Sequence, residues 1–88
     1  MTVLHIADHV ALTLIDFGWR NQDDGTYTKR IRCFADAGQL SDGTRLITLR
    51  LDETGRWLER IDGWGNVERC IDLRNYLAPA PAINAALD

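Results

Sequence analysis

The fold is decided by residues 45–73, which read RLITLRLDETGRWLERIDGWGNVERCIDL. Apolar and polar side chains alternate along three short runs, as they do in strands with one buried face. The runs are Arg45–Asp52, Arg56–Asp62 and Val67–Leu73. Glycine-containing turns at 52–55 and 63–66 separate them. This pattern predicts three consecutive antiparallel strands joined by tight hairpins.

The two turns also predict which residues face each other. We pair Asp52 with Arg56 across the first turn and Gly63 with Gly65 across the second, and both registers place the same set of side chains on one face. That expected inner face holds Ile47, Leu49, Leu51, Trp57, Ile61, Val67 and Ile71. Glu59 and Arg69 fall opposite each other on it, which predicts a cross-strand ion pair.

Upstream, residues 3–17 have the spacing of an amphipathic helix. Its apolar stripe, expected to cover the inner face of the sheet, follows the i, i+4, i+8, i+11 pattern. The stripe consists of Ile6, Val10, Leu14 and Phe17. Thr2 is the expected N-cap and Gly18 the expected residue after the C-terminus. Trp19, just beyond the helix, is expected to fold under its end.

The remaining segments complete one domain. Alternation from Thr26 to Ala35 predicts a further strand, so that the sheet has four strands. After Leu77 the composition shifts to alanine and proline, which predicts a tail over residues 78–88 in which Pro81 can begin a short helix. The sequence therefore predicts one α+β domain over residues 1–77: an N-terminal helix packed on a four-stranded antiparallel meander.

The composition of the chain indicates the cellular compartment in which we expect the protein. The chain has 88 residues, a net charge of −3 and two cysteines, Cys33 and Cys70. Two cysteines are fewer than a disulfide-stabilised secreted domain of this size commonly carries. No run of apolar residues approaches the ~20 needed for a membrane span, and no signal-peptide pattern opens the chain. We expect a cytoplasmic protein with no membrane contact.

Side chains that often carry catalysis or bind metals occur without the spacing that such sites need. His5 and His9 stand one helical turn apart, but no third ligand shares their face. Neither cysteine has a histidine on a neighbouring strand to act as its base. Most of the carboxylates sit in turns, where they usually bind their own backbone. We expect no enzymatic activity, no metal and no cofactor.

The predicted outer face of the sheet is rich in arginine. Its candidate nucleic-acid-binding residues are Arg30, Arg32, Arg50 and Arg60. A basic face of this kind is typical of nucleic-acid contact. The alternative is a solvated face whose arginines pair with acids on neighbouring strands.

A second candidate surface is Trp64, which lies between two glycines at a predicted hairpin tip. Tryptophan is over-represented among the residues that contribute most to protein interfaces. The alternative is that Trp64 packs locally against its own hairpin. The acidic residues Asp16, Asp23 and Asp24 would steer this surface toward a basic partner. The uncovered edge of the first strand also permits a homodimer.

The order of a helix, antiparallel strands and a final helix resembles that of the double-stranded RNA-binding domain. Where that family has a lysine cluster, however, this chain reads PAPAIN at 79–84. In size and acidity the chain is similar in type to small inhibitors carried by phages, such as anti-CRISPR proteins. We therefore expect a non-catalytic protein-interaction module, an inhibitor or regulator of a larger nucleic-acid-handling complex. Nucleic-acid binding by the arginine-rich face is the alternative.

Overall fold

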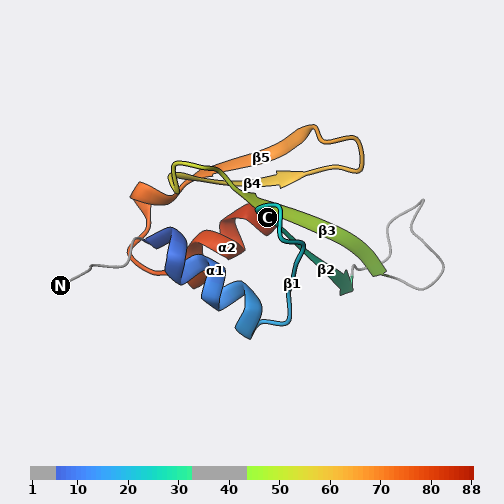
Figure 1. The fold of residues 1–88 in the computed structure, drawn as a ribbon, viewed down its shortest axis with the longest axis horizontal. Coiled ribbons are helices and arrows are strands. Elements are labelled where there is room, and N and C mark those ends of the chain that lie inside the picture. Colours follow the sequence, from blue (N-terminus) through green and yellow to red (C-terminus); the bar gives the residue numbers. More distant parts are fainter. Residues whose placement is uncertain (1–5, 33–43) are drawn as a thin grey trace.

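The computed structural model describes residues 6–32 and 44–88. Within them the chain forms helices on one face of an antiparallel sheet whose strands follow the order β1-β2-β3-β4-β5 (Figure 1). The elements are α1 (Ile6–Asp16), β1 (Arg20–Asn21), β2 (Thr26–Arg32), β3 (Thr44–Leu51), β4 (Trp57–Ile61), β5 (Val67–Asp72), the 3₁₀ helix η1 (Leu73–Asn75) and α2 (Pro79–Leu87). The expected α+β class is confirmed, with five strands in place of four. Among the described residues, no helix is both long and apolar enough to cross a bilayer.

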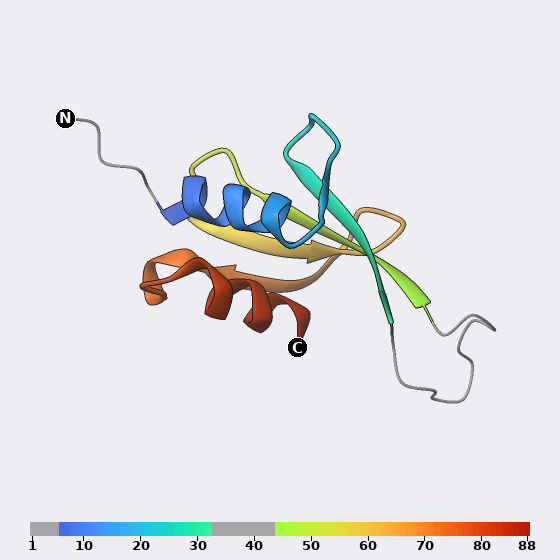
Figure 2. The same cartoon turned by 90° about the horizontal axis from the view of Figure 1, so that it is seen from below.

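The core lies between the sheet and the two helices. Figure 2 shows α1 and α2 side by side on the same face of the sheet, with their C-terminal ends pointing the same way (Figure 2). The buried apolar residues are Val10, Leu14, Trp19, Tyr27, Ile47, Leu49, Leu58, Ile71, Leu73, Ala82, Ile83 and Ala86. The opposite face of the sheet has no helix over it within the described ranges.

Helix α1 ends as its sequence predicts. Gly18 has a φ of +91°, a conformation that glycine adopts without strain. Its N–H donates to the Ile15 carbonyl, and the Trp19 N–H donates to the Leu14 carbonyl at 2.9 Å. These two bonds form a Schellman motif, which turns the chain so that Trp19 folds against Leu14 in the core.

The Schellman motif also explains one wrong prediction on the helix. Phe17 was expected to complete the buried stripe, yet its side chain is 47% exposed. The helix ends at Asp16, and the reversal at Gly18 carries Trp19, which is 4% exposed, under the helix end. Val10 and Leu14 are fully buried, as expected. The predicted N-cap, Thr2, lies outside the described residues.

The additional strand, β1, is only two residues long. It pairs Arg20 with Thr28 and Asn21 with Tyr27, and therefore covers part of the β2 edge. The sequence pattern predicts a turn there, because two polar residues give no alternation to recognise. The predicted continuation of the next strand from Cys33 to Ala35 lies outside the described residues.

The predicted pairing of β3 with β4 is wrong by one residue. The Asp52 N–H donates to the carbonyl of Trp57, where the prediction paired Asp52 with Arg56. The Asp52 carboxylate accepts the N–H groups of Arg56 and Trp57, which stabilises a turn one residue longer than expected. As a result, Leu51 faces Leu58 and Arg50 faces Glu59.

The pairing of β4 with β5 contains a second one-residue shift. Asp62 pairs with Asn66 and Ile61 with Val67, as the predicted register requires. The register then shifts at a β-bulge, so that Arg60 faces Arg69 and Leu58 faces Ile71. The extra residue is Glu68, which lies between the paired residues Val67 and Arg69.

Because each shift is one residue, β3 and β5 keep their predicted faces relative to each other. The side chains of β4, which lies between them, are exchanged between the two faces of the sheet. Ile47, Leu49 and Ile71 are buried on the inner face, as predicted. On β4, however, Leu58 is fully buried, whereas Trp57 and Ile61 belong to the uncovered face. The expected inner positions of Trp57, Ile61 and Val67 are therefore wrong.

The predicted tail at 78–88 packs into the same core as the rest of the chain. Pro79 and Pro81 lie in the first turn of α2, where a missing N–H leaves no helical bond unmade. Ala82, Ile83 and Ala86 are buried against the sheet and α1. The C-terminal carbonyls of α2 accept bonds from the sheet: Arg69 Nε donates to Ala85 at 2.6 Å, and Arg60 Nη1 donates to Ala86 at 3.1 Å.

Candidate protein-interaction surfaces

The turn between β4 and β5 is held by one carboxylate. Asp62 accepts the backbone N–H groups of Trp64 at 2.8 Å and Asn66 at 2.9 Å, while its carbonyl accepts the N–H of Gly65. Gly65 takes a φ of +84°, which completes the reversal. The hydrogen bond from the Asn66 N–H, the largest cause, holds the pKa of Asp62 below its usual value. The backbone that carries Trp64 is therefore well defined.

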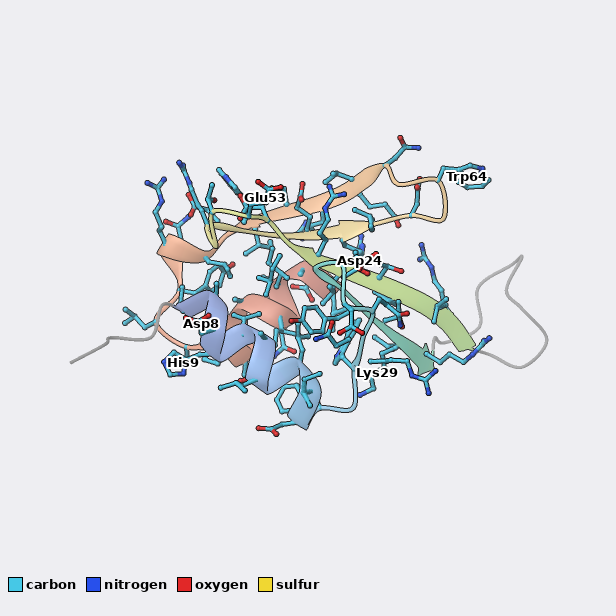
Figure 3. All side chains as sticks on the ribbon, in the orientation of Figure 1. Asp8, His9, Asp24, Lys29, Glu53 and Trp64 are labelled. Atoms are coloured by element: carbon cyan, nitrogen blue, oxygen red, sulfur yellow. The ribbon has the colours of Figure 1, made fainter. Side chains whose placement is uncertain are left out.

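Trp64 itself is 88% exposed, in contrast to the other two tryptophans. Trp19 is in the core, and Trp57 is half-buried beneath the Arg56 guanidinium, whose carbon lies 4.5 Å from the ring centroid. Figure 3 shows the Trp64 side chain at the free end of the hairpin, pointing away from the molecule (Figure 3). The fold gives this large apolar ring no internal packing role.

Further apolar side chains lie on the uncovered sheet face near this turn. Ile61 and Val67 are partners across the hairpin, and Leu46 lies on the same face of β3. Val67 is 47% exposed and Leu46 is 55% exposed. Together with Trp64, these residues form what we call the hairpin patch: Leu46, Ile61, Trp64 and Val67.

The predicted acidic partner residues are all exposed, but they do not join Trp64 in one surface. Asp16 ends α1, while Asp23 and Asp24 lie in the turn between β1 and β2. Figure 3 shows Asp24 well separated from Trp64. Asp24 also accepts hydrogen bonds from the Thr26 side chain and N–H, which lower its pKa. Its carboxylate therefore helps to hold its own turn.

The predicted arginine-rich face does not form as expected. Arg60 lies on the inner face and donates to the end of α2, because the β4 register differs from the prediction. Arg50 Nε donates to Glu59 at 3.0 Å. Arg30 is exposed and makes no ion pair within residues 6–32 and 44–88. The side chain of Arg32 lies outside the description.

Cross-strand ion pairs occupy the uncovered face instead. Glu59 pairs with Arg50, so the predicted Glu59–Arg69 pair is wrong, and Arg69 instead reaches α2. Asp72 accepts from Arg56 at 3.4 Å and from Arg74 at 3.0 Å. The Arg74 hydrogen bond lowers the pKa of Asp72 to about 2. This arrangement corresponds to the solvated sheet that was the alternative interpretation of the arginines.

Of the residues considered for metal or thiol chemistry, the structure describes His9 and Cys70, which lie on different elements. His9 is exposed on α1, and His5 and Cys33 lie outside the described residues. Cys70 is exposed on β5, and burial raises the pKa of its thiol, with the nearby Glu59 carboxylate adding to the effect. In the ranges that the structure describes, no three His, Cys, Asp or Glu side chains gather as metal ligands would.

Sequence reasoning missed a groove of about 540 Å³ at the C-terminal ends of the two helices. Its lining residues are Phe17, Trp19, Lys29, Arg30, Ile31, Ile83, Asn84 and Leu87. An 11-residue helix spans about 16 Å and a seven-residue strand about 23 Å, so α1 is too short to cover the whole of β2. One signal was available: Lys29 follows the inner-face period of Tyr27 and Ile31, where a cation is unusual.

Comparison of the chain with protein-family models, with curated proteins and with solved structures finds no match. Two features of the described structure leave large apolar side chains exposed to solvent: Trp64 in the hairpin patch and Phe17 in the groove.

Proposed function

We propose that this protein is a non-catalytic protein-interaction module that contacts its partner through the hairpin patch. The observation that carries the proposal is the 88% exposure of Trp64 on a turn fixed by the Asp62 carboxylate. Hydration of an indole ring costs free energy, and a partner that covers the ring recovers it. The fold therefore presents an apolar anchor to another molecule.

The geometry of the tip favours strong binding for its size. Interface residues that contribute most to affinity are often tryptophans seated in a pocket of the partner. A side chain on an ordered turn loses little conformational entropy on binding, so more of its burial appears as affinity. Leu46, Ile61 and Val67 extend the apolar area on the sheet face beside the tip.

Charge supports a regulatory role on a basic partner. The chain carries a net charge of −3, and Asp16, Asp23 and Asp24 are exposed. Such charges accelerate association with a positively charged surface rather than tighten the final complex. A small protein held over a basic channel blocks nucleic acid without any chemistry. An inhibitor or regulator of a nucleic-acid-handling complex is the role we propose.

The test compares tagged wild-type protein with two single variants in affinity capture from the source cells, followed by mass spectrometry. Trp64→Ala removes the proposed anchor. Leu77→Ala is the matched control, because Leu77 is fully exposed outside the hairpin patch. Proteins retained by wild type and by Leu77→Ala, but lost with Trp64→Ala, are the expected result. An identical set of proteins with all three would contradict the proposal.

The nucleic-acid alternative makes a different prediction in the same experiment. Arg30→Gln removes an exposed cation of that surface that forms no ion pair with the described residues, and Arg45→Gln is its control on the adjacent strand. Loss of binding with Arg30→Gln alone, together with a steep fall in affinity as salt rises, would favour phosphate contact over protein contact. We expect neither change.

A further inference from the structure

The groove at the helix ends lies beside a part of the β2 edge with which no strand in residues 6–32 and 44–88 pairs. β1 pairs only with Tyr27 and Thr28, and β2 continues past them to Arg32. The groove lining includes Lys29, Arg30 and Ile31 of this continuing part. An apolar hollow and the backbone of an edge strand are thus next to each other.

The direction of the backbone groups at this edge follows from two hydrogen bonds. The Gln22 N–H donates to the Thr26 carbonyl, on the β1 side, and the Leu51 N–H donates to the Gly25 carbonyl, on the β3 side. Because bonding alternates along an antiparallel strand, even-numbered residues of β2 direct their N–H and C=O groups away from β3. Arg30 and Arg32 therefore offer these groups at the edge beyond the end of β1.

The two faces of this edge differ in chemistry. On the helix side, the groove presents the apolar side chains of Phe17, Ile83 and Leu87. The Lys29 ammonium there is bonded to the Phe17 carbonyl. On the opposite side, Arg30 follows the outer-face period of Thr28, and its guanidinium forms no ion pair or hydrogen bond with the part of the chain that is described.

We infer that this edge and groove bind an extended segment of a partner protein in which apolar and acidic residues alternate. Side chains of a strand point to opposite faces in turn. Paired with Arg30 and Arg32, such a segment places its apolar side chains in the groove and its carboxylates beside the Arg30 guanidinium. The backbone provides affinity and the alternation provides specificity, as in other strand-addition complexes.

This site is separate from the hairpin patch, and the inference does not rest on the proposed role of Trp64. No acidic residue is among the eight that line the groove, so no carboxylate there repels the acidic residues of the segment, which lie on the Arg30 side of the edge. Phe17 lines the groove and is 47% exposed. A bound segment would cover it.

The probe is a fluorescein-labelled hexapeptide of alternating valine and glutamate, titrated by fluorescence polarisation. The comparison peptides are alternating valine and lysine, and the valine–glutamate peptide with methylated backbone nitrogens. The acidic peptide should bind at least about tenfold more tightly than either. Amide chemical shifts of the labelled protein should change most around Arg30. Equal affinity for all three peptides, or shifts confined to the β4–β5 turn, would overturn the inference.

Variants with matched controls locate the site. Phe17→Glu and Arg30→Glu should each weaken the acidic peptide about tenfold or more. Leu12→Glu, at an exposed position of α1, and Arg45→Glu, on the strand next to β2, should leave the affinity unchanged. Trp64→Ala should also have no effect, which separates this test from that of the hairpin patch. Loss with the control variants but not with the first pair would contradict the assignment.

Two other occupants give distinct results. If the β2 edge pairs with a second copy, sedimentation shows a dimer that Arg30→Pro dissociates, because proline has no N–H to donate. If the groove binds a small apolar anion instead, anilinonaphthalene sulfonate binds and the peptide does not. Either result would replace the proposed occupant.

Discussion

Arg60 on the sheet reaches the end of helix α2, where its Nη1 donates to the carbonyl oxygen of Ala86 at 3.1 Å. The same guanidinium donates to the Asp88 carbonyl, and Arg69 donates to that of Ala85. These oxygens lie at or just past the helix C-terminus, where the macrodipole is negative and few intrahelical donors remain. Two arginines on neighbouring strands therefore take the place of a C-terminal cap and fix α2 to the sheet.

The first prediction concerns this contact. Arg60→Met keeps the apolar stem but removes the donors, so it should lower the free energy of unfolding by about 1–2 kcal/mol. Arg45→Met is the control, since the ion pair of Arg45 with Glu68, at 3.4 Å, is exposed and its loss should change stability by at most about 0.5 kcal/mol. Urea denaturation followed by circular dichroism measures both. Equal losses would show that Arg60 does not cap α2.

The register of β4 gives a second prediction. Leu58 is fully buried, so Leu58→Ala should destabilise the fold by about 2–5 kcal/mol. Val67→Ala should cost less than about 1 kcal/mol, because Val67 is 47% exposed. The same urea denaturation experiment gives the loss in free energy of unfolding for each variant. The opposite order would restore the register expected from the sequence.

The ion pair between Arg50 and Glu59 gives a third prediction. Arg50 and Glu59 are 38% and 17% exposed, so their coupling in a double-mutant cycle should be about 0.5 kcal/mol. A cycle between Glu59 and Arg69 should give none, since Arg69 bonds to α2. Free energies of unfolding for the single and double variants supply both numbers. Coupling found only in the second cycle would be incompatible with the structure.

Acid should destabilise the protein, because carboxylates hold its turns. Hydrogen bonds from Thr26, Thr54 and Asn66 lower the pKa values of Asp24, Asp52 and Asp62, and Arg74 lowers that of Asp72 to about 2. A folded-state pKa below the unfolded value means that the unfolded chain binds more protons. Their contribution is therefore complete above about pH 4 and is lost as pH falls toward about 2.

Melting temperatures measured between about pH 6 and about pH 2 should follow this course. Asp62→Asn retains an acceptor in the turn but cannot titrate, so its curve should fall less steeply than that of wild type. Parallel curves for the two proteins would show that Asp62 titrates alike in the folded and unfolded chains.

The sequence was sufficient for the elements and insufficient for their register. The C-terminal end of α1, the locations of the two hairpins, and the inner positions of Ile47, Leu49 and Ile71 follow from periodicity and from the glycines. The inversion of β4 does not, because the Asp52 carboxylate lengthens one turn by a residue and a bulge at Glu68 inserts another. These two insertions are equal in size. The two predicted registers therefore placed the same residues on one face, although the first was wrong throughout and the second was wrong beyond the bulge.

The candidate interaction surfaces likewise include features that the sequence predicts and features that depend on the fold. The position of Trp64 at a hairpin tip is predictable from its flanking glycines, whereas its 88% exposure required the structure, because a tip side chain can also fold back onto its own hairpin. The strand register decides which face of the sheet each arginine lies on. The contact of Arg60 with the C-terminal end of α2 was therefore not predictable from the sequence. The groove depends on the relative lengths of helices and strands in three dimensions. Its one signal in the sequence is Lys29, a cation at an inner-face position of its strand.

The most direct test of the central claim is whether Trp64 becomes buried when the protein binds its partner. Protein labelled with 5-fluorotryptophan should give three ¹⁹F resonances, one per tryptophan, and Trp64→Phe assigns the one of interest. In the free protein this resonance should shift between H₂O and D₂O, because its ring is 88% exposed, whereas that of Trp19 should not. In the complex with the captured partner, the solvent shift of Trp64 should disappear. A Trp64 resonance that keeps its full solvent shift in the complex would contradict the account.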